Sequence, residues 1–107
     1  MEIAYICSPY QNDPVRNAER AKGYCRHALR QGFVPLAVHL HYPQFLNEND
    51  PAQRQIGLDC GLTLLRKCDA LFAYGNQITA GMKREIAEAE RLNIPVYYMD
   101  DYEGEAI

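Results

Sequence analysis

A strand, a helix and a second strand follow one another in residues 69–99, which read DALFAYGNQITAGMKREIAEAERLNIPVYYM. The apolar run at 69–74 does not alternate with polar residues, which is typical of a strand buried on both faces of a parallel sheet. Residues 79–93 carry apolar side chains at helical spacing, and 94–99 returns to β-prone residues. This order predicts two parallel strands joined by a crossover helix. The positions expected to face the sheet from that helix are Met82, Ile86 and Ala89.

Upstream, the compact run IAYIC at 3–7 predicts another buried strand, closed by the loop that begins at Ser8. Asp13 followed by Pro14 is typical of a helix N-cap and a first helical position. Gly32 is typical of the residue that ends a helix. A helix is therefore expected between these two signals.

The next strand is expected at 33–38, where Pro35 removes a backbone donor from the ladder and so favours an edge of the sheet. Residues 39–49 show no regular pattern and read as a loop. Asp50 and Pro51 then repeat the capped helix start. The core side of this second helix is expected to carry Ile56, Leu58, Leu62 and Leu65.

The alternation of strands and helices predicts an α/β fold, a single-domain three-layer sandwich over residues 1–107. Its sheet should be parallel and flavodoxin- or Rossmann-like, with about four to five strands in the order 2-1-3-4. In such a sheet the chain winds in opposite directions on either side of the first and third strands, and ligands bind in the crevice at that switch point. The loops at 8–12 and 75–81 should line it.

Composition narrows the class of function. The chain has 107 residues, of which 48% are hydrophobic, and a formal net charge of −3. An acidic balance argues against a nucleic acid polymer as partner, and leaves room for a small-molecule nucleoside or nucleotide in a local pocket. The longest apolar runs fall far below the roughly 20 residues of a membrane helix, so no membrane association is expected.

The cysteines and the start of the chain favour a cytoplasmic location. Cys7, Cys25, Cys60 and Cys68 form no CxxC motif, and the first two fall in segments predicted as buried, so reduced core thiols are expected. Met1 leads almost directly into the first strand, so no signal peptide is expected. Because no GxGxxG or P-loop motif occurs either, no cofactor is predicted.

Glu85 is the first candidate for chemistry. It lies near the start of the 79–93 helix, one turn after Gly81, so its carboxylate can point back over the helix N-terminus into the crevice. Gly81 would leave space there for a ligand against the backbone. The alternative is an ordinary acid that interacts favourably with the positive end of a helix.

Two further features lie near the crevice. Arg16 falls in the first turn of the first helix, where free N–H groups can bind an anion such as a nucleotide phosphate; a solvated helix face is the alternative. His39 and His41 are expected at the C-terminal end of the second strand, and because alternating residues of a strand share a face, they should reach the site together or not at all. One of them could donate a proton to a leaving base, or both could be hydrogen-bonded loop residues. No metal site is predicted, because the pair lacks a third ligand.

Residues 81–89, GMKREIAEA, after the strand at 69–74, resemble the nucleoside 2-deoxyribosyltransferase superfamily. In that superfamily a strand that opens with Asp is followed by a loop, Gly, three residues and Glu. The opening YICSPY at 5–10 is similar to its first strand and substrate loop, and VHLHYPQFL at 38–46 to the His-containing segment of a short branch of it.

The resemblance implies an enzyme that cleaves the N-glycosidic bond of a small nucleoside or nucleotide. It would transfer the deoxyribosyl group to another base or to water. Glu85 would be the nucleophile and form a covalent glycosyl-enzyme, a role that suits a carboxylate facing an oxocarbenium-like centre. A homo-oligomer is also implied, because enzymes of this kind complete their pockets with a neighbouring subunit, and the apolar segment 42–45 favours an interface. The residues expected to bind substrate are Ser8, Pro9, Tyr10, Asn12, Arg16, His39, Asn76 and Gly81.

Two positions depart from the superfamily pattern. Thr79 stands six residues before Glu85, and Gly61 stands eight residues before Asp69, where members usually carry Asp. The acid that would protonate the departing base is therefore absent from its usual place. The alternative function is a noncatalytic nucleotide-binding or sensing module of the same fold.

Overall fold

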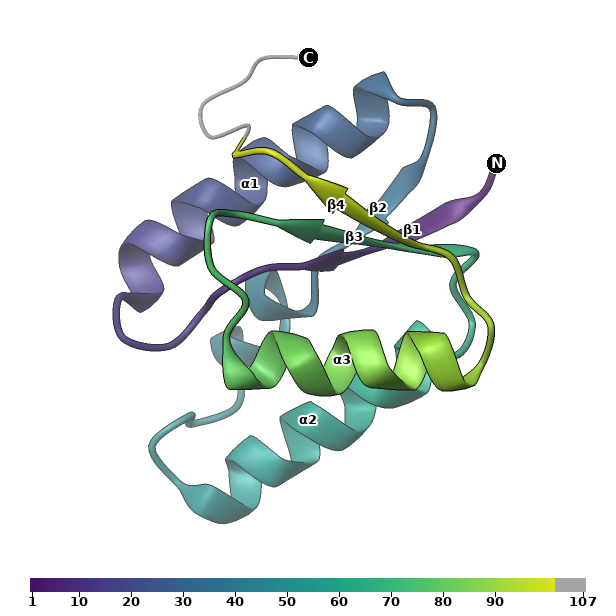
Figure 1. Cartoon of the computed structure of the whole chain (residues 1–107). Coiled ribbons are helices and arrows are strands. Elements are labelled where there is room, and N and C mark those ends of the chain that lie inside the picture. Colours follow the sequence, from purple (N-terminus) through teal and green to yellow (C-terminus); the bar gives the residue numbers. More distant parts are fainter. Residues whose placement is uncertain (102–107) are drawn as a thin grey trace.

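The computed structural model describes residues 1–101. The strands form one parallel sheet in the order β2-β1-β3-β4, with α1 on one face and α2 and α3 on the other (Figure 1). Both the α/β fold class and the strand order are as the sequence predicts. In chain order the elements are β1 (Ile3–Cys7), α1 (Pro14–Arg30), β2 (Val34–Leu36), the short 3₁₀ helices η1 (Val38–Leu40) and η2 (Tyr42–Gln44), α2 (Pro51–Leu65), β3 (Ala70–Tyr74), α3 (Ala80–Arg91) and β4 (Val96–Met99).

Side-chain caps begin all three α-helices. The carboxylates of Asp13 and Asp50 accept hydrogen bonds from backbone N–H groups in the first turns of α1 and α2, at 3.3 and 2.9 Å. The hydroxyl of Thr79 accepts one from the first turn of α3 at 3.2 Å. Each bond satisfies a donor that has no partner within its helix. Gly32, with φ of +86°, takes the left-handed conformation just past α1.

Alternate residues of the two central strands pack on opposite faces of the sheet. On the α1 side, Ile6 and Phe72 share a buried cluster with Tyr24 of α1. On the other side, Tyr5 and Leu71 belong to a second buried cluster. All of β3 is buried, as its non-alternating sequence predicts. The α3 residues of the second cluster are the three expected, Met82, Ile86 and Ala89.

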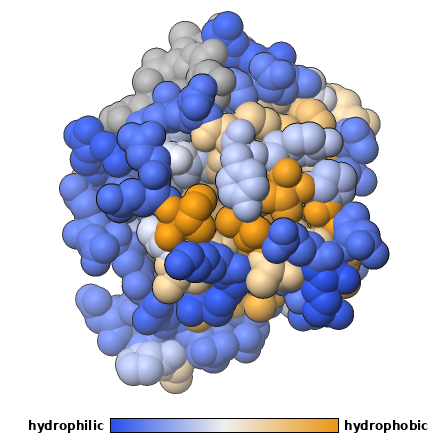
Figure 2. All heavy atoms as spheres, viewed as in Figure 1, coloured by the Kyte–Doolittle hydropathy of each residue, from blue (hydrophilic) through white to orange (hydrophobic). Residues whose placement is uncertain are grey.

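The edge strand β4 leaves aromatic side chains exposed to solvent. Hydrophobic residues gather in the middle of the face seen in Figure 2, over β4 and the sheet-facing side of α3, whereas the outer faces of the helices are hydrophilic. Tyr97 and Tyr98 of β4 are 48% and 66% exposed. The β4 strand is therefore an edge strand with aromatic side chains at the surface.

The second strand is shorter than the predicted 33–38. Leu36 is its last residue paired with β1, opposite Tyr5. Beyond Leu36 the chain turns into η1, and Val38 joins the buried cluster on the α2 and α3 side of the sheet. His39 and His41 therefore do not lie on a strand.

One predicted core position of α2 is wrong. Ile56 is 51% exposed, whereas Leu65 at the end of the helix is fully buried. The reason is the direction of α2, whose first half projects away from the sheet (Figure 1). Leu58 and Leu62, between them, are partly buried.

All four cysteines are free, as expected for reduced thiols. Cys7 and Cys68 are buried, but Cys25, expected in the core, is only partly buried. Across residues 1–101, no helix has the length and apolar character needed to span a membrane.

Candidate active site

A cavity of about 280 Å³ opens beyond the carboxyl ends of β1 and β3. This volume lies near the lower end of the range for small-molecule sites. Its walls come from the loop after β1, from η1, from one side of α2 and from the first two turns of α3. These are the elements that meet where the direction of chain winding reverses, which is the expected place for a ligand in such a sheet.

The carboxyl group of Glu85 lies in the wall of this cavity, where the hydroxyl of Tyr5 donates a hydrogen bond to its Oε2 atom. Helical spacing explains why Glu85 faces inward, since it stands three residues after the buried Met82 and next to the buried Ile86. Strand alternation points Tyr5 toward the same helix. The two side chains, 80 residues apart in sequence, therefore meet between β1 and α3.

Burial controls the ionisation of this pair. It raises the pKa of Glu85, while hydrogen bonds from Tyr5 and Cys7 and the nearby charge of Arg84 oppose the rise. Burial, followed by the proximity of Glu85, raises the pKa of Tyr5 well above its ordinary value. The phenol therefore stays protonated and remains a donor to the carboxyl group.

Gly61 of α2 makes room for the Tyr5 hydroxyl. A Cβ atom added at Gly61 would lie 3.1 Å from the Tyr5 oxygen, closer than most side-chain contacts allow. This is the position at which the resembling superfamily usually carries Asp. In this chain the space in front of position 61 holds the phenol of Tyr5 instead.

His39 forms part of an aromatic wall. Its ring stacks on that of Tyr10 at a centroid distance of 4.9 Å and an interplanar angle of 15°. Burial lowers the pKa of His39 to about 4, so its imidazole is neutral at pH 7. His39 therefore does not offer the imidazolium proton considered for a leaving base.

The expectation that His39 and His41 share a face is wrong. Only His39 is among the residues that line the cavity, and the ring of His41 packs 5.1 Å from the rings of both Tyr42 and Phe45. His39 lies in η1 and His41 is the residue that ends it, so their side chains do not share a face as residues two apart on a strand would.

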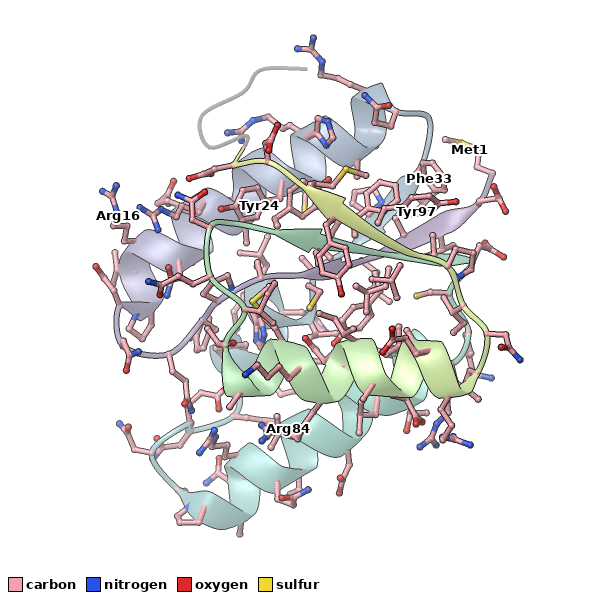
Figure 3. All side chains as sticks on the ribbon, viewed as in Figure 1. Met1, Arg16, Tyr24, Phe33, Arg84 and Tyr97 are labelled. Atoms are coloured by element: carbon pink, nitrogen blue, oxygen red, sulfur yellow. The ribbon has the colours of Figure 1, made fainter. Side chains whose placement is uncertain are left out.

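The structure divides the predicted site residues into two groups. Pro9, Arg16 and Asn76 do not line the cavity. Arg16 and Asn76 are exposed, and Figure 3 shows Arg16 pointing outward from α1. The predicted residues that do line the cavity are Ser8, Tyr10, Asn12, His39, Gly81 and Glu85.

Asn17, the residue after Arg16, holds the loop that lines the site. Asn17 is buried, and its side-chain amide donates hydrogen bonds to the backbone oxygens of Tyr10 at 2.9 Å and Gln11 at 3.2 Å. These bonds hold the loop after β1 in place. In that loop, Asn12 takes a left-handed φ of 79°.

Several lining residues were not predicted. Tyr5, Glu48 and Arg84 carry polar or charged groups to the cavity wall, and none stands in a motif that marks it. The sequence did contain one signal for the cavity wall, because the α2 residues that line the cavity recur at helical spacing. Those positions are Arg54, Gly57, Leu58, Gly61 and Leu62. In the part of the chain that the structure describes, no three His, Cys, Asp or Glu side chains gather as a metal site would require.

The fold is similar to that of a solved 2-deoxyribosyltransferase. A solved structure of the 2-deoxyribosyltransferase from the psychrotolerant bacterium Bacillus psychrosaccharolyticus matches with a TM-score of 0.68 and 19% sequence identity. The match covers 97% of this chain and 75% of that one. The chain belongs to the family described as Domain of unknown function (DUF7768), whose model matches residues 2–99. Among curated proteins no sequence matches it significantly.

Proposed function

We propose that this protein is an N-glycosidic bond enzyme that acts on a small nucleoside or nucleotide, with Glu85 as its nucleophile. One observation supports this proposal most. On a fold shared with a 2-deoxyribosyltransferase, the carboxyl group of Glu85 lies in the wall of the cavity and receives a hydrogen bond from the buried Tyr5. Such a group is suited to attack an electron-poor sugar carbon.

The reaction has two steps. In the first, an oxygen of the Glu85 carboxylate forms a bond to the anomeric carbon, and the bond from that carbon to the base nitrogen breaks. The base leaves with the electron pair and takes a proton from solvent at the open side of the cavity. In the second, a water molecule or a second base attacks the same carbon and loses a proton, and the carboxylate is released.

The surrounding residues have separate tasks in this proposal. Tyr5 orients the carboxyl group and moderates the rise of its pKa. Ser8, Tyr10 and Asn12 supply polar groups from the loop after β1 for sugar and base. Neutral His39, stacked on Tyr10, offers a flat surface and one N–H group to a base.

The test is a panel of deoxynucleosides and their 5′-monophosphates, each incubated with and without an acceptor base. Release or exchange of base is the expected result. A 2-fluoro-2-deoxy analogue should leave a glycosyl adduct that mass spectrometry maps to Glu85.

A noncatalytic nucleotide-binding module is the second candidate. It is favoured by the absence of an acid at Thr79, which caps α3, and at Gly61, whose space Tyr5 occupies. Thermal stabilisation by a nucleotide without any release of base would support this module and contradict the enzyme.

We also propose that the whole chain is one cytoplasmic domain that assembles into a homo-oligomer. Phe45, in the segment expected at an interface, is 58% exposed. A large apolar side chain in this setting favours contact with a partner. Light scattering at tens of micromolar should give a mass above that of the 12.2 kDa chain. A monomer mass would contradict the oligomer only.

A further inference from the structure

Two arginines from neighbouring helices line the cavity. Arg54, at the end of the first turn of α2, and Arg84, in the second turn of α3, both line it. Both also line a shallow depression that adjoins the cavity, together with Pro51, Gln55 and Leu58. Figure 3 shows Arg84 in the space between the two helices.

These arginines are unpaired, unlike others on the same side of the sheet. Arg66 and Arg91 form ion pairs with Glu88 at 2.9 and 2.8 Å. Within residues 1–101, neither Arg54 nor Arg84 makes a side-chain hydrogen bond or ion pair, although Glu48 and Glu85 line the same cavity. Two guanidinium groups at one cavity, with no carboxylate within ion-pair distance, leave ten N–H donors unused there.

The position is favourable for an anion for a second reason. The cap residue Thr79 and the first two residues of α3, Ala80 and Gly81, also line the cavity, and the first turn of that helix carries no acidic residue. Its N-terminal end therefore adds a positive potential to that of the two arginines. Arg84 is close enough to Glu85 to lower the pKa of that carboxyl group, so a bound anion would lie near the reactive carboxyl.

We propose that Arg54 and Arg84 form a phosphate subsite, so that the substrate is a nucleoside 5′-monophosphate rather than a nucleoside. This inference rests on the proposed function, because it places the reacting sugar next to Glu85. The planar guanidinium groups match the geometry of phosphate oxygens and bind them in bidentate pairs. Arg16, the residue expected from sequence to bind phosphate, does not line the cavity.

The binding test uses calorimetry with 2-deoxyribose 5-phosphate, the four deoxynucleosides and their 5′-monophosphates. Wild type should bind a monophosphate about tenfold or more tightly than its nucleoside, as hydrogen bonds to charged groups imply. The double variant Arg54→Gln/Arg84→Gln should lose this difference and its affinity for the sugar phosphate, with nucleoside affinity unchanged. Each single variant should lose part of it.

Lys83→Gln is the matched control, since it removes a positive charge next to Arg84 from an exposed position outside the cavity. It should keep the wild-type preference, and thermal unfolding should show that every variant is folded. A wild type that binds nucleoside and monophosphate equally, or a preference that survives in the double variant, would overturn the subsite.

The outcomes separate this inference from the proposed function. Cleavage of nucleosides and monophosphates with equal kcat/KM would overturn the subsite and leave the glycosidic function standing. Arginine-dependent binding of 2-deoxyribose 5-phosphate without cleavage of any substrate would support the subsite and contradict the enzyme.

Discussion

The two faces of the sheet both bury tyrosines but use them differently. On the α1 face, Tyr24 and Tyr74 stack at 4.5 Å, and the Tyr74 hydroxyl lies 2.8 Å from Nδ1 of His27. On the other face, the Tyr5 hydroxyl donates to Glu85 at the wall of a cavity. In the first arrangement the rings fill the space and the polar atoms bond to one another, which stabilises the fold. In the second, an ionisable pair borders empty space, which stability alone does not require.

The largest expected effect comes from Glu85→Gln. This change keeps the size of the side chain and an acceptor for Tyr5, but removes the charge that attacks carbon. Activity should fall by several orders of magnitude because the covalent route is lost, while the free energy of unfolding should change by less than about 1 kcal/mol. Turnover of deoxynucleoside monophosphates and chemical denaturation measure the two effects.

Glu88→Gln is the control for that experiment, because Glu88 lies one turn further along α3 and pairs with Arg66 and Arg91 outside the cavity. It should leave activity near the wild-type level. If Glu85→Gln kept a substantial share of turnover, Glu85 would not be the nucleophile.

On the α1 face, Phe72→Ala should lower stability strongly and leave turnover unchanged. Phe72 is almost fully buried and contacts the rings of Phe33 and Tyr97. Removing a buried phenyl ring typically costs about 3 to 5 kcal/mol of unfolding free energy. Turnover per folded molecule should stay unchanged, as activity measured well below the melting temperature would show. A large loss of kcat in folded protein would mean that the two faces are coupled.

Tyr5→Phe tests whether the hydroxyl on the cavity face tunes the carboxyl group. Without this donor the pKa of Glu85, already raised by burial, should rise further. The nucleophile must be ionised, so the acid limb of the kcat/KM profile should move to higher pH, with about a tenfold loss below that limb for each pKa unit.

Tyr74→Phe is the matched control on the opposite face. It should cost about 1 kcal/mol of stability, as a lost hydrogen bond does, without moving the acid limb. Equal shifts of the limb in both variants would contradict a special role for Tyr5.

The smallest effect concerns stability and pH. Because the folded-state pKa of Glu85 is raised, the folded protein holds this proton more tightly than the unfolded chain does. That contribution is complete at acid pH and is lost as pH rises through the folded-state pKa. The stability of Glu85→Gln relative to wild type should therefore increase with pH over this window. Denaturation series across pH measure it, and a relative decrease would show that the carboxylate is stabilised instead.

The elements and their order were accessible from sequence because their signals are local. The caps at Asp13 and Asp50 and the non-alternating run of β3 each depend on a few neighbouring residues. Helical spacing also predicted that Glu85 would lie toward the crevice. The predicted end of β2 at residue 38 was wrong. The strand ends where its pairing with β1 stops, and Val38 packs in the core instead.

The partners of Glu85 were decided only by the tertiary structure. Tyr5 meets it across 80 residues of sequence, and the hydroxyl fits because position 61 on a third element has no side chain. Arg54 and Arg84 line the same cavity because α2 and α3 lie side by side (Figure 1). Sequence patterns report the period of one helix or strand, whereas such a site depends on distances between elements that packing alone sets.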